Sequence, residues 1–202
     1  MKTSLKTVVT TALTALVLST SVFTSFAAEK VNTMDVNPFN PEIKRVIVSG
    51  NVKVLLVQSF YEQVAVEDGY ADKVSVKQVG HTLTVNSNEK NPVTVTVYVY
   101  EPYRIVASDK ATVRTVGKFD VKHLQVMLKG DAVAYIKAKT ESLYTVVNDR
   151  ADLELHGSTA NHIIKSDGLA KLRTDNFAAL KIDRVAPENE VAMNVNPASV
   201  KK

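Results

Sequence analysis

The sequence predicts an all-β protein whose N-terminal β-sheet strands continue into a β-helix-like solenoid. Three observations predict it: a motif that recurs every 19–21 residues, period-2 alternation of β-branched residues, and turn residues between the alternating runs. No stretch after residue 27 combines helical periodicity with helix caps. We therefore expect strands throughout the domain.

The recurring motif is Ala-x-apolar or Ala-x-Ala, and it occurs four times in the second half of the chain. Its copies begin 21, 19 and 19 residues apart, at Ala111, Ala132, Ala151 and Ala170. A fixed period with alternation inside each copy is typical of stacked strands. The alanines and the residues two positions later should point inward. The outward residues should align in two columns: Arg114, Tyr135, Glu154 and Arg173, and Thr112, Val133, Asp152 and Lys171. This alignment predicts the ion pairs Asp152–Lys171 and Glu154–Arg173.

Apolar and polar residues alternate as clearly in the first half of the domain. From Val93 to Val99, every second residue is valine, and threonine or tyrosine lies between. Turn signals such as Asp68-Gly69 and Gly80-His81 separate these runs, and they predict hairpins and a largely antiparallel sheet here. The second half instead has polar corners that contain Asp109, Asp131, Asp149 and Asp167. Aspartate suits such corners because it tolerates positive φ.

Composition changes along the chain predict four segments. Residues 1–27 read as a signal peptide, 28–42 as an N-terminal linker rich in Asn and Pro, and 43–186 as the β-solenoid domain. Residues 187–202 form a C-terminal tail, and the alternation of Val191, Met193 and Val195 makes it a candidate last strand or cap. Its Asn, Pro and Lys residues argue instead for a frayed end.

The first segment predicts export. Lys2 and Lys6 precede an apolar run, and Ser25-Phe26-Ala27 supplies the small residues at which signal peptidase cleaves. The alternative is an uncleaved anchor, although threonines and serines dilute the run. No later stretch approaches the length of a spanning helix, so we expect no stable membrane insertion after cleavage and a periplasmic or extracellular location.

Composition excludes several classes of function. The chain has no cysteine, so disulfides, thiol catalysis and cysteine-ligated zinc are excluded. Its formal net charge is +4, but basic and acidic residues are interspersed, and nucleic-acid binding requires clustered Lys and Arg. No phosphate loop, dinucleotide fingerprint or nucleophile elbow occurs. We expect no cofactor, no metal and no nucleic-acid partner.

The strand and turn pattern resembles a known family. The stretch from Val48 to Gln58, the runs that end in Glu67 and Val85, the strand from Val93 to Tyr100 and the aspartate corners resemble the head GIN domain family. This family comprises exported bacterial proteins described as putative auto-transporter adhesins. The resemblance covers residues 43–186. It implies a β-rich, β-helix-like fold and a binding role at the cell envelope or surface, without a catalytic signature.

Three functions fit these observations. The leading hypothesis is an exported, non-enzymatic module that acts as an adhesin or as a cell-envelope binding or scaffold protein, with an envelope protein or a glycan as partner. The second is a carbohydrate-active enzyme of β-helix type that uses the corner aspartates, because two carboxylates about 5–10 Å apart can hydrolyse a glycosidic bond. The third is a structural protein that self-associates through an open end of the solenoid.

Two groups of residues are candidates for a site. Tyr98 and Tyr100 follow Thr94 and Thr96 on one face of a strand, and they are the candidate contact surface; packing under a loop is the other interpretation. His156 and His162 flank a polar loop, where a two-histidine site would compete with ordinary solvated histidines.

Overall fold

The computed structural model describes residues 32–34, 41–167 and 169–185, and these residues form strands and turns without a helix. The prediction of an all-β protein is confirmed. The predicted signal peptide (1–27), residues 28–31 and 35–40 of the linker, and the tail (187–202) lie outside the described residues. The strands are β1 (Asn32–Met34), β2 (Arg45–Gly50), β3 (Val52–Gln58), β4 (Gln63–Val66), β5 (Ser75–Val79), β6 (Thr82–Ser87), β7 (Val93–Val99), β8 (Arg104–Ala107), β9 (Thr112–Val116), β10 (His123–Leu128), β11 (Val133–Val147), β12 (Asp152–Ser166) and β13 (Lys171–Val185).

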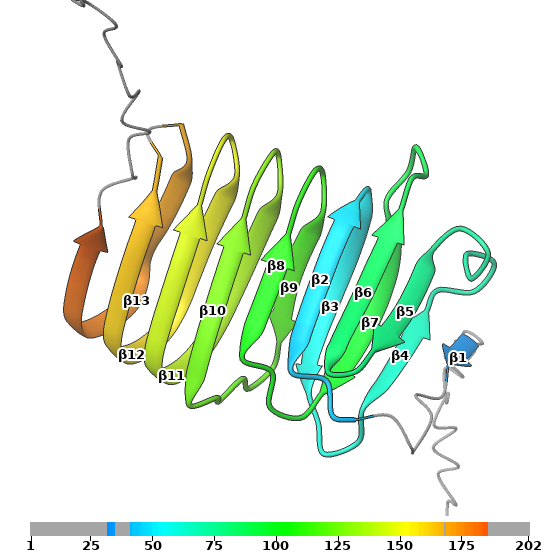
Figure 1. The fold of residues 1–202 in the computed structure, drawn as a ribbon, viewed down its shortest axis with the longest axis horizontal. Helices are drawn as coiled ribbons and strands as arrows, with labels where there is room; N and C mark the ends of the chain where they lie inside the picture. The colour runs from blue at the N-terminus through cyan, green and yellow to red at the C-terminus, as the bar shows by residue number, and fades with distance from the viewer. Residues whose placement is uncertain (1–31, 35–40, 168, 186–202) are drawn as a thin grey trace, which may run out of the picture.

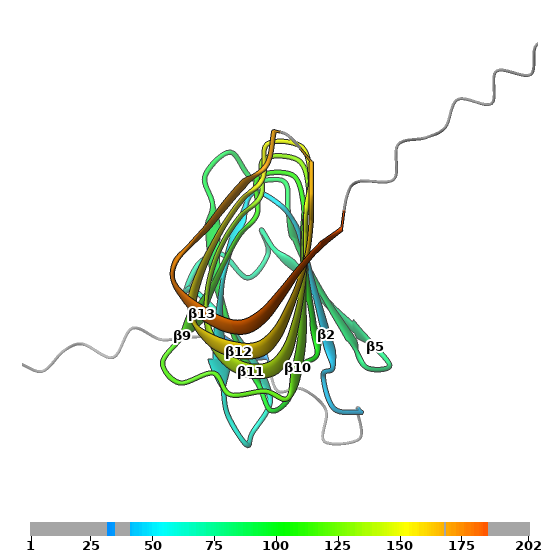
Figure 2. The ribbon, with the colours of Figure 1, turned by 90° about the vertical axis from the view of Figure 1, so that its left-hand side faces the viewer.

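All of these strands belong to one curled sheet of 13 strands. Its hydrogen-bonded path runs through β7, β3 and β9 to β11, and it returns through β10, β8, β2 and β6. The long strands β11, β12 and β13 each bend from one side of the curl to the other (Figure 1). Viewed from the β13 end, the sheet wraps around an enclosed interior (Figure 2).

Neighbouring strands along the curl pair in parallel. In one outward column, Thr112 pairs with Val133, Val133 with Asp152, and Asp152 with Lys171. These offsets are 21, 19 and 19 residues (133 − 112, 152 − 133, 171 − 152), the intervals that the recurring motif predicts. The other predicted column, from Arg114 to Arg173, is also in register.

One of the two predicted ion pairs forms as expected. A guanidinium nitrogen of Arg173 lies 2.9 Å from a carboxylate oxygen of Glu154. The same nitrogen lies 3.2 Å from Asp152, so Asp152 pairs with Arg173 and not with Lys171. The long, planar guanidinium reaches two carboxylates at once, which the compact ammonium of a lysine does less readily.

The prediction of a largely antiparallel first half is wrong. β2 pairs in parallel with β6 and β8, and β3 pairs in parallel with β7 and β9. Among the described strands, antiparallel pairing occurs only at the two ends of the strand order: β5 pairs with β6 at one end, and β4 with β7 and β1 with β4 at the other. The two strands that flank the Gly50 corner do not pair with each other but enter opposite sides of the curl, and turn residues alone do not distinguish these outcomes.

The core fills the space inside the curl with small and branched aliphatic side chains. The inward residues of the first three motif copies are fully buried: Ala111, Val113, Ala132, Ala134, Ala151 and Leu153. Ala170 and Leu172 are only half-buried, because β13 is the last described strand at this end. Leu180, on the same strand, is 90% exposed.

Gly157 supports a close approach between two adjacent strands. Its φ is +104°, and a Cβ atom there would lie 2.1 Å from the carbonyl oxygen of Ala138, its register partner in β11. We expect Gly157→Ala to lower the free energy of unfolding by at least about 1 kcal/mol, because it adds a steric clash to an unfavourable φ. Chemical denaturation measures the loss. Gly69→Ala is the matched control, since Gly69 also has a positive φ of 76° but no atom within 4 Å of an added Cβ. Equal losses in the two variants would contradict the close packing.

His162 is buried in the core, which corrects the expectation of a solvated loop histidine. It is 1% exposed, its Nε2 lies 3.0 Å from the hydroxyl of Thr145, and its ring meets Phe177 edge-on. Burial, together with the nearby charge of Arg184, lowers the pKa of His162 to about 4.

This burial makes stability depend on pH. The pKa of an unfolded histidine is about 6.5, so the unfolded state gains the proton first, and stability falls as the pH falls from 7 to 5. We expect His162 to contribute roughly 2 kcal/mol to that loss. Urea denaturation at both pH values measures it, and His162→Leu should remove most of the dependence. The exposed His123 gives the control His123→Gln; a pH dependence unchanged in His162→Leu would refute the assignment.

Candidate functional site

The corner aspartates hold neighbouring turns together along the upper edge of the sheet in Figure 1. The carboxylate of Asp109 accepts a hydrogen bond from the N–H of Gly50 at 3.1 Å, and Asp149 accepts one from Gly130 at 2.8 Å. Asp167 accepts a bond from the N–H of Asp149 in the same way. Asp131 instead binds the guanidinium of Arg150 at 2.7 and 2.9 Å. Each corner carboxylate therefore has a structural partner.

The electrostatics of these corners suit turns better than acid catalysis. The hydrogen bond from Arg150 lowers the pKa of Asp131, and hydrogen bonds from backbone N–H groups lower the pKa of Asp167. Asp109 and Asp149 adopt positive φ values of 62° and 60°, as the corner interpretation predicts. A general acid for glycoside hydrolysis needs a raised pKa, so neither Asp131 nor Asp167 fits that role.

The two predicted contact tyrosines lie in different environments. Tyr98 is half-buried on β7, where its register partners are Val57 of β3 and Gln63 of β4. Tyr100 follows the end of β7 at the lower edge and is 42% exposed. Tyr100 thus lies on an accessible corner, whereas Tyr98 is largely covered by its neighbours in the sheet.

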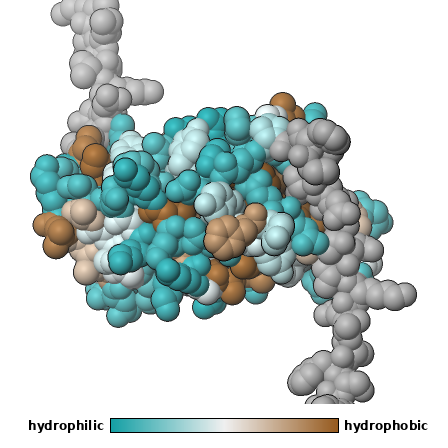
Figure 3. All heavy atoms as spheres, turned by 90° about the horizontal axis from the view of Figure 1, so that it is seen from below, coloured by the Kyte–Doolittle hydropathy of each residue, from teal (hydrophilic) through white to brown (hydrophobic). Residues whose placement is uncertain are grey.

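Tyr100 belongs to a cluster of exposed aromatic residues, which we call the aromatic patch: Phe60, Tyr61 and Tyr100. Phe60 and Tyr61 are each 85% exposed, and the rings of Phe60 and Tyr100 lie 5.6 Å apart. Phe60 and Tyr100 line a hollow of about 330 Å³ together with Gln58, Ser59, Lys118 and Asp120. Seen from below, hydrophobic residues emerge between hydrophilic ones on this side of the protein (Figure 3). An exposed aromatic ring does not gain the favourable free energy of burial, and a partner that covers it would supply that free energy. The patch is therefore a candidate contact surface.

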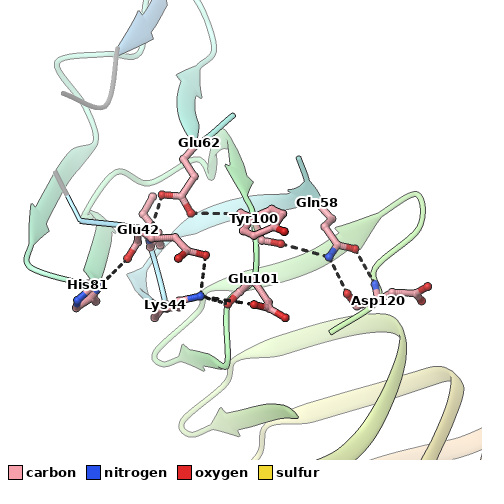
Figure 4. Close-up of polar contacts among 9 residues, drawn as sticks. Glu42, Lys44, Gln58, Glu62, His81, Tyr100, Glu101 and Asp120 are labelled. Atoms are coloured by element: carbon pink, nitrogen blue, oxygen red, sulfur yellow. Dashed lines mark hydrogen bonds and ion pairs between the residues drawn. The ribbon is translucent and has the colours of Figure 1, made fainter. Parts of the chain in front are cut away.

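Side chains from two other segments fix the backbone of Tyr100 (Figure 4). Gln58 Nε2 donates to the carbonyl oxygens of Asp120 and Tyr100, at 2.7 and 3.2 Å. Its Oε1 accepts from the N–H of Asp120 at 2.7 Å, so the amide of Gln58 imitates a peptide group of a strand. On the other side, the carboxylate of Glu62 accepts from the N–H groups of Tyr100 and Ile43, at 3.3 and 2.8 Å. The backbone of the patch at Tyr100 is therefore fixed by hydrogen bonds on both sides.

An ionic cluster of Glu42, Lys44 and Glu101 lies at the same corner. The ammonium of Lys44 lies 2.7 Å from Glu42 and 3.8 Å from Glu101, which directly follows Tyr100. Figure 4 shows these residues beside the Glu62–Tyr100 contact. The chain from Tyr100 to Glu101 is thus tied to the segment that enters β2.

The structure does not bring the two candidate histidines together. His162 faces the core, while His156 lies on the outer side, 2.7 Å from the carboxylate of Glu154. The described part of the chain contains no cluster of three His, Asp or Glu side chains suited to a metal ion. Within the same residues, no helix is long and apolar enough to cross a membrane.

Sequence reasoning found one member of the aromatic patch and missed the rest of it. Phe60 and Tyr61 follow an alternating strand after one residue, Ser59, where turn residues are usual, and that aromatic pair was the available signal. Gln58 carried no signal, because its role depends on contacts with segments about 40 to 60 residues away. Lys118 carried none, because its place beside Phe60 and Tyr100 depends on the fold.

The fold and this edge define an all-β protein with an exposed group of aromatic residues at one edge of its sheet. The comparison with family models identifies the family. Residues 43–196 match the family described as putative auto-transporter adhesin, head GIN domain, and the chain belongs to it. The resemblance inferred from the strand pattern is confirmed.

Solved structures share the fold at low sequence identity. A putative adhesin from Bacteroides fragilis superposes with a TM-score of 0.67 at 14% identity, covering 77% of this chain and 75% of that one. A putative adhesin from Parabacteroides distasonis gives 0.58 at 11% identity, with 77% of each chain covered. A putative lipid binding protein from the same species gives 0.52 at 10% identity, covering 77% and 78%. No curated protein matches the chain.

The role of Gln58 can be tested without a ligand. Gln58→Ala removes three hydrogen bonds, and we expect it to lower the free energy of unfolding by about 1–3 kcal/mol. Hydrogen exchange at the amide of Asp120 should also accelerate at least about tenfold, because its acceptor is lost. Gln125→Ala is the control, since Gln125 is also half-buried but accepts one side-chain hydrogen bond, from Arg104. Unchanged exchange at Asp120 would show that Gln58 does not hold this corner.

Proposed function

We propose that this protein is an exported, non-enzymatic adhesin-like module that binds a cell-envelope or surface glycan through the aromatic patch. The observation that carries the proposal is the exposure of Phe60 and Tyr100 around a hollow, with the exposed Tyr61 next to Phe60 in the chain and the backbone of Tyr100 held by hydrogen bonds. Aromatic rings with an apolar face and, in tyrosine, a polar tip are suited to sugar rings, which are themselves amphipathic. Membership of a family described as adhesins supports the same role.

We further propose that the curled sheet is a β-solenoid with two strands in each turn of the chain. The parallel offsets near 20 residues and the bonds between successive corners support this interpretation. A scaffold of this kind resists distortion along its length and presents its loops at fixed spacing. The lower edge would then serve as the binding side and the upper corners as the structural side.

The proposed absence of catalysis follows from the use of the corner carboxylates. Asp109, Asp149 and Asp167 bind backbone N–H groups, and Asp131 binds Arg150. The lowered pKa values of Asp131 and Asp167 favour the charged form at neutral pH. The carbohydrate-active enzyme therefore finds no support among these residues.

Export rests on the sequence and the family together. The predicted signal peptide at residues 1–27 and the adhesin description of the family both favour a location outside the cytoplasm. A glycan of the envelope or of a neighbouring surface would be accessible there.

A glycan array followed by calorimetry tests the proposed function. We expect binding to at least one surface polysaccharide, and a loss of affinity of at least about fivefold in Phe60→Ala and in Tyr100→Ala. Leu180→Ala removes a side chain of similar exposure at the other end of the sheet and is the matched control. The proposal fails if no glycan binds, or if the two patch variants bind as tightly as the control.

A further inference from the structure

A second hollow lies next to the aromatic patch on the outer side of the sheet. It measures about 590 Å³, and its polar lining consists of Arg114, Thr115, Lys118, Tyr135, Lys137, Glu154 and His156. Lys118 lines both this hollow and the one that contains Phe60 and Tyr100. The two hollows are therefore neighbours on one surface.

The hollow exists because two paired strands separate. The pairing of β9 with β11 ends at Arg114 and Tyr135. At the next position, the hydroxyl of Thr115 accepts from the N–H of Lys137 at 2.7 Å and donates to its carbonyl oxygen at 3.2 Å, in place of the backbone ladder. The chain returns to β11 only at Phe119, whose carbonyl oxygen accepts from the N–H of Lys139. Gly117 and Lys118 span the gap.

Three cations surround the opening. The guanidinium of Arg114 lies 5.7 Å from the centre of the Tyr135 ring, which holds the side chain over the sheet. Lys118 lies 2.9 Å from Asp120. Within the described part of the chain, neither Arg114 nor Lys137 has an ion-pair partner. Two cations are thus available to an anionic ligand.

The one carboxylate in the lining, that of Glu154, lies on the side of the hollow next to β13. Glu154 lies 2.9 Å from Arg173 and 2.7 Å from His156, and the hydrogen bond with His156 and the charge of Arg173 lower its pKa. Arg173 also lies 3.2 Å from Asp152, so it offsets the negative charge of Glu154 only in part. The side lined by Arg114, Lys118 and Lys137 keeps an excess of positive charge.

We propose that this hollow binds a carboxylated sugar unit of an acidic polysaccharide. The carboxylate would lie between Arg114 and Lys137, because a guanidinium offers paired donors that fit a carboxylate. Val116 is 41% exposed and offers an apolar surface for the sugar ring. The carboxylate of Glu154 can accept a hydrogen bond from a sugar hydroxyl. The inference rests on the proposed glycan binding and adds the charge of the ligand to it.

Lys118 connects this site to the aromatic patch. One polysaccharide chain can place an acidic unit in the larger hollow and a neighbouring unit against Phe60 and Tyr100. The aromatic patch would supply affinity for sugar rings in general, and the cationic hollow would select acidic chains over neutral ones.

Calorimetry with oligogalacturonate tests this selectivity, and the same oligosaccharide fully methyl-esterified is the neutral comparison. We expect the acidic form to bind the protein at least about tenfold more tightly, and its affinity to fall as sodium chloride is raised. Arg114→Gln and Lys137→Gln should each weaken the acidic form about fivefold or more and leave the methyl ester unaffected. Lys77→Gln makes the same change in net charge on the exposed strand β5 and should have no effect.

The outcomes separate the two proposals. Equal binding of both oligosaccharides, or affinity for the acidic form that is unchanged in Arg114→Gln and Lys137→Gln, overturns the acidic site. If Tyr100→Ala still weakens binding in that case, the aromatic patch stands alone as the glycan site. If neither oligosaccharide binds, the acidic site is overturned, and the array with neutral glycans decides the proposed function by itself.

Discussion

Parallel, in-register hydrogen bonding between strands about 20 residues apart is the constraint on which the rest of this structure depends. Once Ala134 pairs with Leu153 and Tyr135 with Glu154, every inward residue meets an inward neighbour and every outward residue joins a column. The small alanines of the first three motif copies fit the narrow interior of the curl, where they are fully buried. The corner carboxylates reinforce the same register by binding the N–H groups of adjacent turns. A one-residue slip would expose the core and break these corner bonds together.

The candidate binding features appear where this regular pairing is interrupted. Beside the aromatic patch, the amide of Gln58 replaces a strand peptide between Tyr100 and Asp120. Beside the cationic hollow, the hydroxyl of Thr115 bonds to both backbone groups of Lys137. In both places a side chain bonds to backbone groups that have no partner in the strand ladder there. The scaffold and the proposed site are therefore built from the same hydrogen-bonding rules.

The sequence predicted the parts of this structure that depend on local pattern. The strands, the outward columns and the positive φ of Asp109 and Asp149 follow from alternation and turn chemistry. The parallel pairing of β2 and β3 with distant strands did not follow, because the Gly50 corner is compatible with a hairpin or with a change of side. The alternation of His162 with Ile164 is consistent with a buried position, but the polar residues that precede His162 favoured a loop instead. The hollow at Arg114 and Lys137 required the separation of β9 from β11, which no local signal encodes.

Engineered disulfides test the central register most directly, because the natural chain has no cysteine. Lys139 and Ser158 are register partners on adjacent strands, so Lys139→Cys combined with Ser158→Cys places two thiols within bonding distance. The account predicts that this pair oxidises to an intramolecular disulfide and leaves the β-sheet circular dichroism intact. The shifted pair Lys139→Cys with Ala160→Cys should remain reduced under the same conditions, since two residues of offset exceed the reach of a disulfide. Oxidation of the shifted pair in preference to the aligned pair would contradict the register and the arrangement built on it.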